Sequence, residues 1–150
     1  MSASPLVTVL LPVWNGASLP LTAEGEEPLR VAIRSLARQE AAPDAPVPGF
    51  VVLAVDDGST DGTAALLDAL AAEYPCLRVL HRPHEGLPGA LNAGLESARG
   101  TLIARMDADD VCHPQRLALQ AAWMAVHPET GLLATRVPFG GDRETARGFA

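Results

Sequence analysis

Five of the nine aspartates fall in two short segments, each placed directly after an apolar run. Asp56 and Asp57 follow one run, and Asp107, Asp109 and Asp110 follow another. Crowded carboxylates repel one another unless a cation or hydrogen-bonding ligand groups lie between them. Asp107 and Asp109 are separated by one residue, so in extended backbone both project to the same side and can face one hard cation. This spacing favours the binding of a divalent metal together with a diphosphate.

The same residue types also have a purely structural use. Aspartates in turns after strands cap helices and accept hydrogen bonds from backbone N–H groups. For either segment taken alone, this structural role explains the aspartates about as well as a ligand site does. The placement of both segments at strand ends favours the ligand site.

The elements that must position these residues alternate along the chain. We expect buried strands at residues 6–13, 50–55, 77–81, 101–106 and 131–137, and helices at 28–39, 63–74, 90–99 and 114–127. A turn is expected at 56–59 and a glycine-bearing loop at 86–89. Such alternation predicts an α/β fold with an open, mostly parallel twisted sheet and helices on both faces. Ligands of such sheets bind beyond the carboxyl ends of the strands.

Composition excludes several classes of protein. The 150 residues, 48% of them hydrophobic, suit one globular domain. Lysine is absent, which excludes P-loop NTPases and Schiff-base enzymes. A net charge of −7 without a basic cluster argues against nucleic acid as a partner. The two cysteines form no CxxC pair, which disfavours a zinc site or disulfide framework.

Membrane and export signals are also missing from the sequence. No apolar run reaches the roughly 18 residues of a membrane helix, so no integral membrane segment is expected. The first residues lack the charged region of a signal peptide. We expect a cytoplasmic protein, and this composition leaves a peripheral membrane association open.

Four segments resemble the family 2 glycosyltransferases of GT-A (Rossmann-like) fold. They are VTVLLPVWNG (7–16), VVLAVDDGSTDGT (51–63), GLPGALNAGLESARGTLIARMDADD (86–110) and HPQRLALQ (113–120). The resemblance covers almost the whole chain in the same order and spacing. It implies metal-dependent transfer, with inversion, from a nucleotide-diphosphate sugar donor. The implied cofactor is Mn²⁺ or Mg²⁺. The acceptor, whether glycan, lipid or small molecule, is unspecified, and a homodimer is compatible with the sequence.

The resemblance assigns nucleoside contacts to two segments. Pro12, Trp14 and Asn15 occupy the loop that packs on the base and ribose, although the aromatic position more often holds tyrosine. Asp57 matches the aspartate that hydrogen-bonds the base, and Asp56 is expected to be structural. A carboxylate that accepts from an imide N–H fits uracil or thymine, so a UDP- or dTDP-type donor is implied.

The resemblance places diphosphate and metal contacts further along the chain. Gly86 and Gly89 would let the backbone approach the diphosphate, and Asn92 would hold the loop. Asp107 and Asp109 match the DxD motif, with Asp109 as the direct metal ligand and Asp107 in contact with ribose or metal. Arg105 would help to hold phosphate.

The remaining histidines and tryptophan have simpler interpretations. His113 precedes a helix and is expected to cap it, and Trp123 is expected in the core. His81, His84 and His127 show no partner pattern in the sequence.

The chain is expected to hold only part of an enzyme. Residues 1–137 would form the donor-binding domain, and 138–150 a tail that begins a missing acceptor-binding half, through truncation of the gene or of the protein. Glu129, Asp142 and Glu144 are isolated, so no catalytic base is assigned, and it is expected beyond Ala150.

Two alternatives follow. The first is a donor-binding fragment without complete catalytic activity. The second is a haloacid dehalogenase-like phosphatase, because Asp107-Ala108-Asp109-Asp110-Val111 resembles the nucleophile motif of that family, with Asp107 as the nucleophile. That family carries the motif on its first strand and needs a lysine.

Overall fold

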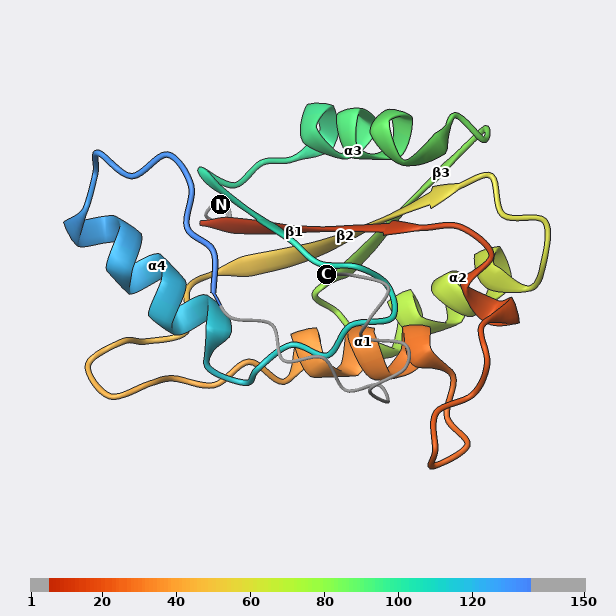
Figure 1. The fold of residues 1–150 in the computed structure, drawn as a ribbon, viewed down its shortest axis with the longest axis horizontal. Coiled ribbons are helices and arrows are strands. Elements are labelled where there is room, and N and C mark those ends of the chain that lie inside the picture. Colours follow the sequence, from red (N-terminus) through yellow and green to blue (C-terminus); the bar gives the residue numbers. More distant parts are fainter. Residues whose placement is uncertain (1–5, 136–150) are drawn as a thin grey trace, which may run out of the picture.

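The chain folds around a parallel sheet of four strands, seen in a computed structural model that describes residues 6–135. The strands are β1 (Val7–Val13), β2 (Phe50–Asp57), β3 (Leu77–Arg82) and β4 (Leu102–Arg105). Their order is β3-β2-β1-β4, with parallel pairing throughout (Figure 1). The expected α/β fold is confirmed.

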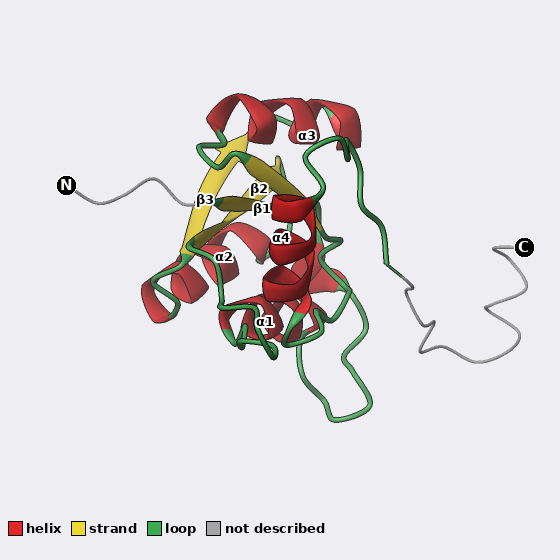
Figure 2. Ribbon diagram, turned by 90° about the vertical axis from the view of Figure 1, so that its left-hand side faces the viewer, coloured by secondary structure: helices red, strands yellow, loops and turns green. Residues whose placement is uncertain are grey.

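Helices cover both faces of this sheet. They are α1 (Pro28–Ala37), α2 (Thr63–Glu73), α3 (Gly86–Ser97) and α4 (Arg116–Val126), and a short 3₁₀ helix, η1, spans Gly16–Ser18. Helix α3 lies on one face, and α1 and α2 lie on the other (Figure 2). The chain reaches β4 only after crossing β2 and β1, so the strand order reverses beside β1.

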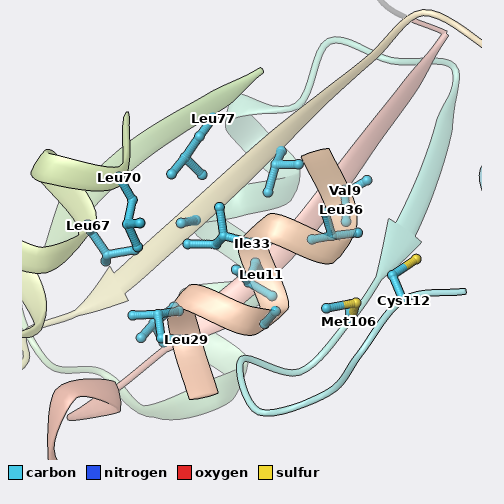
Figure 3. Close-up of a cluster of buried hydrophobic side chains, with 14 of the residues drawn as sticks. Val9, Leu11, Leu29, Ile33, Leu36, Leu67, Leu70, Leu77, Met106 and Cys112 are labelled. Atoms are coloured by element: carbon cyan, nitrogen blue, oxygen red, sulfur yellow. The ribbon is translucent and has the colours of Figure 1, made fainter. Parts of the chain in front are cut away.

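The larger core lies between the sheet and helices α1 and α2. Alternate residues of a strand face opposite sides, and β1 places Val9 and Leu11 toward this core. Leucine and isoleucine side chains from α1 and α2 complete it (Figure 3). The helix α1 alone contributes Leu29, Ala32, Ile33 and Leu36, all fully buried.

The opposite core is smaller because α3 packs with short side chains. Its buried cluster contains Leu10, Leu53, Val55 and Ala90. A Cβ at Gly94 would stand 3.1 Å from a methyl of Leu10 and 3.2 Å from one of Val55. Glycine therefore allows the close approach of α3 to the sheet.

Three expectations about the elements were wrong. Asp56 and Asp57 are the last residues of β2 rather than a turn. The expected loop at 86–89 is the first turn of α3, because proline and glycine are tolerated there and α3 begins at Gly86.

The third correction concerns the expected strand at 131–137. Residues 131–135 form no strand, and Leu132 is 87% exposed, because no described backbone segment pairs with this run. Residues 136 and 137, like the tail at 138–150, lie outside the described residues. Among residues 6–135, none of the helices combines the length and apolar character that a membrane span requires.

Candidate functional site

The segments that carry the candidate residues meet at one edge of the sheet. Because all four strands are parallel, their carboxyl ends lie at the same edge (Figure 1). Trp14 follows β1, Asp57 ends β2, His84 follows β3 and Asp107 follows β4. Ligands of open α/β sheets bind at this edge, where the strand order reverses.

Asp56 and Asp57 are adjacent on β2 and therefore face opposite sides of the sheet. Asp56 is 3% exposed and lies on the side of α2. One oxygen accepts the Ser59 N–H at 3.1 Å, and the other lies 2.9 Å from His81 Nδ1. His81 Nε2 in turn lies 3.1 Å from an oxygen of Asp68 on α2. The expectation of a structural Asp56 agrees with these contacts.

These contacts shift the pKa values of both partners. Burial raises the pKa of Asp56, but the hydrogen bonds from Ser59 and His81 outweigh it and hold the pKa below its ordinary value. The hydrogen bonds to Asp56 and then to Asp68 raise the pKa of His81. The trio is thus a charge-assisted link between β2, β3 and α2.

Asp57 faces the side of α3 and is also 3% exposed. Its oxygens accept the backbone N–H groups of Glu85 at 2.8 Å and Gly86 at 2.9 Å. The first N–H groups of a helix lack partners within the helix, and a carboxylate there also benefits from the helix dipole. Asp57 thus caps α3 from a neighbouring strand.

The same carboxylate holds His84. His84 Nδ1 lies 2.8 Å from Asp57 Oδ2 and 3.0 Å from the Asp57 carbonyl oxygen. The imidazole stacks on the indole of Trp14, with 5.0 Å between ring centroids and 26° between the planes. Gly58 makes this approach feasible, because it has a φ of +65° and a Cβ there would meet His84 N at 2.5 Å.

The loop after β1 is fixed against the loop after β2 through Asn15. Its backbone is left-handed, with a φ of 51°. Its N–H donates to Ser59 Oγ at 2.9 Å, and its side-chain oxygen accepts the Thr60 N–H at 2.8 Å. Asn15 therefore joins two loops of the candidate site, and Trp14 stands beside it with 56% of its surface exposed.

Pro12 lies in the central strand β1, where a missing N–H would normally be costly. Leu10 O accepts the Met106 N–H at 3.1 Å, and pairing with β4 ends at Leu10. Residues two apart in a strand direct their backbone groups to the same side, so Pro12 faces the β4 side beyond the last pair. Half-buried Pro12 thus costs the sheet no hydrogen bond.

The aspartates after β4 are open to solvent. Asp109 and Asp110 are exposed and Asp107 is half-exposed. Arg105 donates to Asp107 at 2.7 Å, which places its guanidinium beside this aspartate. Although Asp110 is exposed as a residue, partial desolvation of its carboxyl group, followed by the charges of Asp107 and Asp109, raises its pKa. The cluster carries the repulsion that a bound cation would relieve.

These residues suit a metal ion that is held by one or two protein carboxylates, rather than a site in which the protein supplies every ligand. Among residues 6–135, no three His, Cys, Asp or Glu side chains converge as a metal cluster. Mg²⁺ commonly takes one or two carboxylates and completes its shell with waters and substrate phosphates. Asp109, and the Asp107 oxygen that Arg105 does not occupy, can serve as those carboxylates.

The other predicted residues lie on or next to α3 and α4. Gly86 opens α3 with a φ of +80°, and Gly89 follows within its first turn. Asn92 is exposed on α3, without a hydrogen bond among the described residues that would hold the loop. His113 Nδ1 accepts the Gln115 N–H at 3.2 Å in the turn before α4, so its bond is to the residue before the helix rather than to the first N–H groups of α4. Trp123, expected in the core, is 41% exposed and stacks on His127.

Sequence reasoning missed His84 and His81. Asp56 and Asp57, which contact His81 and His84, are 25 and 27 positions away along the chain, and nothing local marks the pairs. The available signal was that His81 lies on β3 and His84 follows it, β3 being the neighbour of β2 in the sheet. A hollow of about 610 Å³ is lined by Thr8, Phe50, Arg78 and Arg99 among others. These residues lie toward the opposite edge of the sheet from the candidate site.

Comparison with known proteins agrees with this geometry. The model of the Glycosyl transferase family 2 matches residues 8–148. The amylovoran biosynthesis glycosyltransferase AmsE of Erwinia amylovora is 32% identical over 132 residues, 88% of this chain and 45% of that protein. The undecaprenyl-phosphate 4-deoxy-4-formamido-L-arabinose transferase of Pseudomonas paraeruginosa is 38% identical over 107 residues, 69% of this chain and 28% of that protein.

A solved structure extends the likeness to the fold. The mannosyltransferase PcManGT from Pyrobaculum calidifontis, in complex with GDP-Man and Mn²⁺, has a TM-score of 0.65 and 26% identity. The match covers 83% of this chain and 33% of that one. The chain belongs to glycosyl transferase family 2 and has its GT-A fold. It spans less than half the length of these curated relatives.

Proposed function

We propose that the chain is the donor-binding portion of a metal-dependent, inverting glycosyltransferase that uses a UDP- or dTDP-type sugar donor. The observation that carries this proposal is the meeting of Trp14, Asp57 and the Asp107–Asp109 pair at the carboxyl edge of one parallel sheet. The family assignment supports it and displaces the phosphatase alternative for Asp107. PcManGT, with GDP-Man and Mn²⁺ bound, supports a nucleotide-sugar donor and a divalent metal, although not the choice of base.

Each group of residues is assigned to a different part of the donor. In this proposal Pro12, Trp14 and Asn15 would border the base and ribose, and Asp57 would contribute to the base site. Gly86 and Arg105 would contact the diphosphate, and Asn92 lies further along α3. Asp109 would bind Mn²⁺ or Mg²⁺ directly, and Asp107 would contact the metal or the ribose. When bound, the cation neutralises charge that develops on the leaving diphosphate.

The acceptor side is not assigned to any residue of this chain. Inverting transfer needs a carboxylate base to deprotonate the acceptor hydroxyl. Because the relatives are more than twice as long as the matched region, we propose that the base and the acceptor site belong to the part of the protein that corresponds to their remaining length.

Titration calorimetry with UDP tests the metal and donor site. We expect UDP to bind in MnCl₂ or MgCl₂ more tightly than in EDTA, because Asp107 and Asp109 would hold a cation whose charge would offset that of the diphosphate. Asp109→Ala should abolish the metal-dependent part of the binding. Glu96→Ala removes an exposed carboxylate on α3, away from the carboxyl end of β4, and should leave binding unchanged. Wild-type affinity in Asp109→Ala would refute the site assignment.

A second function is compatible with the short span of the chain. The 150 residues would bind the donor without completing transfer. Incubation with a labelled UDP-sugar and candidate acceptors separates the two functions. Labelled product formed by this chain would exclude a pure binding role, whereas donor binding without product would favour it.

A further inference from the structure

We infer that the hollow at the amino ends of the strands binds an organic phosphate monoester. The phosphate contacts Arg78 and Arg99, and the apolar group lies on the sheet. The volume of the hollow, about 610 Å³, is within the range of roughly 300–1,000 Å³ that ligand pockets have. The hollow lies at the opposite edge of the sheet from the candidate site, so this ligand is additional to the proposed sugar donor.

The floor of the hollow is formed by the sheet where α3 no longer covers it. Val51 and Leu53 of β2 line the hollow and face the side of α3, because Leu53 belongs to the smaller core and residues two apart face the same side. Helix α3 ends at Ser97, which borders the hollow, as do Pro75 and Cys76 just before β3. An apolar ligand group would remove part of this half-buried surface from water, which is favourable.

Arg78 is held in place without losing its charge. It is in register with Leu53 of β2, so its side chain starts from the same face of the sheet. Its Nη1 donates to the carbonyl oxygens of Pro75 and Leu77, both at 2.9 Å. Neutral carbonyls orient a guanidinium but do not neutralise it, and the other donors of Arg78 have no partner among residues 6–135. The guanidinium is thus oriented and available to an anion.

Arg99 is brought to the hollow by the path of the chain between α3 and β4. Thr8 Oγ1 accepts the N–H groups of Arg99 at 3.4 Å and Gly100 at 3.0 Å. A Cβ at Gly100 would stand 2.7 Å from Thr8 N, so a side chain at this position would collide with β1. The Arg99 side chain is exposed and makes no hydrogen bond or ion pair within the described part of the chain. Its backbone is therefore fixed, while its charge stays available.

Charge complementarity favours a phosphate monoester as the ligand. Arg78 and Arg99 lack the carboxylate partner that other arginines have, namely Arg30, Arg34, Arg82 and Arg105. No Asp or Glu is among the described residues that line the hollow, although the chain has a net charge of −7. A phosphate monoester carries a charge of about −1.5 to −2 at pH 7 and accepts paired hydrogen bonds from guanidinium groups. It therefore matches two arginines better than a singly charged carboxylate or sulfonate does.

Titration calorimetry with 1-naphthyl phosphate tests the site, in metal-free buffer so that no cation holds the phosphate at Asp107 and Asp109. We expect Arg78→Gln and Arg99→Gln each to weaken binding about threefold to tenfold, because each loses a partly solvent-screened contact with the phosphate. Both variants should keep the circular dichroism spectrum of the wild type. Arg38→Gln removes an exposed arginine outside the hollow that has no ion pair among residues 6–135, and it should leave binding unchanged.

The rate at which N-ethylmaleimide labels Cys76 shows whether the ligand occupies the hollow. Cys76 is half-buried and lines the hollow, whereas the other cysteine, Cys112, is 4% exposed and lies elsewhere. At a 1-naphthyl phosphate concentration of about ten times Kd, labelling of Cys76 should slow about tenfold, because only the free chain reacts. Inorganic phosphate and 1-naphthalenesulfonate should both bind more weakly, since one lacks the apolar group and the other the second charge.

The contrary results can be told apart. Equal affinity for inorganic phosphate and 1-naphthyl phosphate would overturn the role of the apolar floor, and equal affinity for the sulfonate would overturn the match to a dianion. Unchanged binding in both arginine variants, or labelling of Cys76 that the ligand does not slow, would overturn the site itself. Metal-dependent binding of UDP is measured separately, so its presence or absence decides only the proposed function.

Discussion

The aspartates of the candidate site have the same side chain but differ in how far they are buried. Asp57 is 3% exposed and bonded to backbone N–H groups, whereas Asp109 is exposed at the end of a short edge strand. A buried acceptor stabilises the fold by satisfying donors, while an exposed carboxylate is available to a cation. Burial therefore indicates that Asp57 supports the start of α3, whereas Asp109 is accessible to a cation.

Replacing Asp57 by alanine should lower the free energy of unfolding by about 2 kcal/mol, because two N–H groups at the start of α3 lose their acceptor. Urea denaturation followed by circular dichroism measures the change. Asp109→Ala is the comparison and should stay within about 0.5 kcal/mol of the wild type. Equal stability of the Asp57 and Asp109 variants would contradict the capping role.

At the scale of elements, β2, β3 and α2 are joined by ionisable groups. His81 lies between the buried carboxylate of Asp56 and the exposed carboxylate of Asp68. Each ring nitrogen faces an acceptor, so the protonated imidazole suits both contacts. The strength of this link therefore depends on pH.

The folded-state pKa of His81 is raised above its ordinary value, first by the hydrogen bond to Asp56. Its contribution to stability is thus complete below the unfolded-state pKa, about 6.5, and is lost as pH rises through the folded-state pKa. We expect the free energy of unfolding to fall from pH 6 to pH 8 by less than about 1 kcal/mol, because His81 is 42% exposed and solvent screens the pair.

Urea denaturation at both pH values measures this change. His81→Gln should reduce the difference between them, whereas His127→Gln should not. If His81→Gln keeps the wild-type difference in unfolding free energy between pH 6 and pH 8, that difference does not arise from His81.

The elements could be predicted from the sequence where apolar runs are long, and less well at their ends. Val7–Val13 and Pro28–Ala37 were expected within two residues, because a buried strand and an amphipathic helix have strong patterns. The pattern failed at Asp56 and Asp57, since polar residues that end a buried strand look like a turn. It failed at 131–135 because an apolar run alone does not supply a partner strand.

The candidate site was predictable in its position but not in its contacts. Listing the residues after each expected strand identified Trp14, Asp57 and Asp107. The stack of Trp14 on His84 depends on strand order, and β3 lies two places from β1 in the sheet. Without that order, His84 and His127 look alike in the sequence, although only His84 lies at the candidate site.

The whole molecule is asymmetric about its sheet. Four fully buried residues of α1 belong to the larger core, whereas α3 buries two alanines and a glycine. Buried leucine and isoleucine contribute roughly 1.5–3 kcal/mol each, and alanine contributes much less. The face that carries α3, and with it the Asp57 cap, is therefore held less strongly.

Hydrogen exchange should reveal this asymmetry. We expect backbone amides of α3 to open at a free energy about 2 kcal/mol or more below those of α1, because local opening follows apolar burial. Exchange followed by mass spectrometry or NMR resolves the two helices, and α2, with Leu67 and Leu70 buried, should exchange like α1. Equal protection of α1 and α3 would show that the sheet alone governs their stability.

The adjacency of Asp56 and Asp57 ties the register of β2 to both layers of the molecule. The Asp56 carboxylate is linked to α2 through His81, and the Asp57 carboxylate accepts a hydrogen bond from the first residue of α3. A slip of β2 by one residue would turn each to the wrong side and break both attachments together. An insertion or deletion within β2 would therefore disrupt the candidate site even where the hydrophobic composition of the strand is preserved.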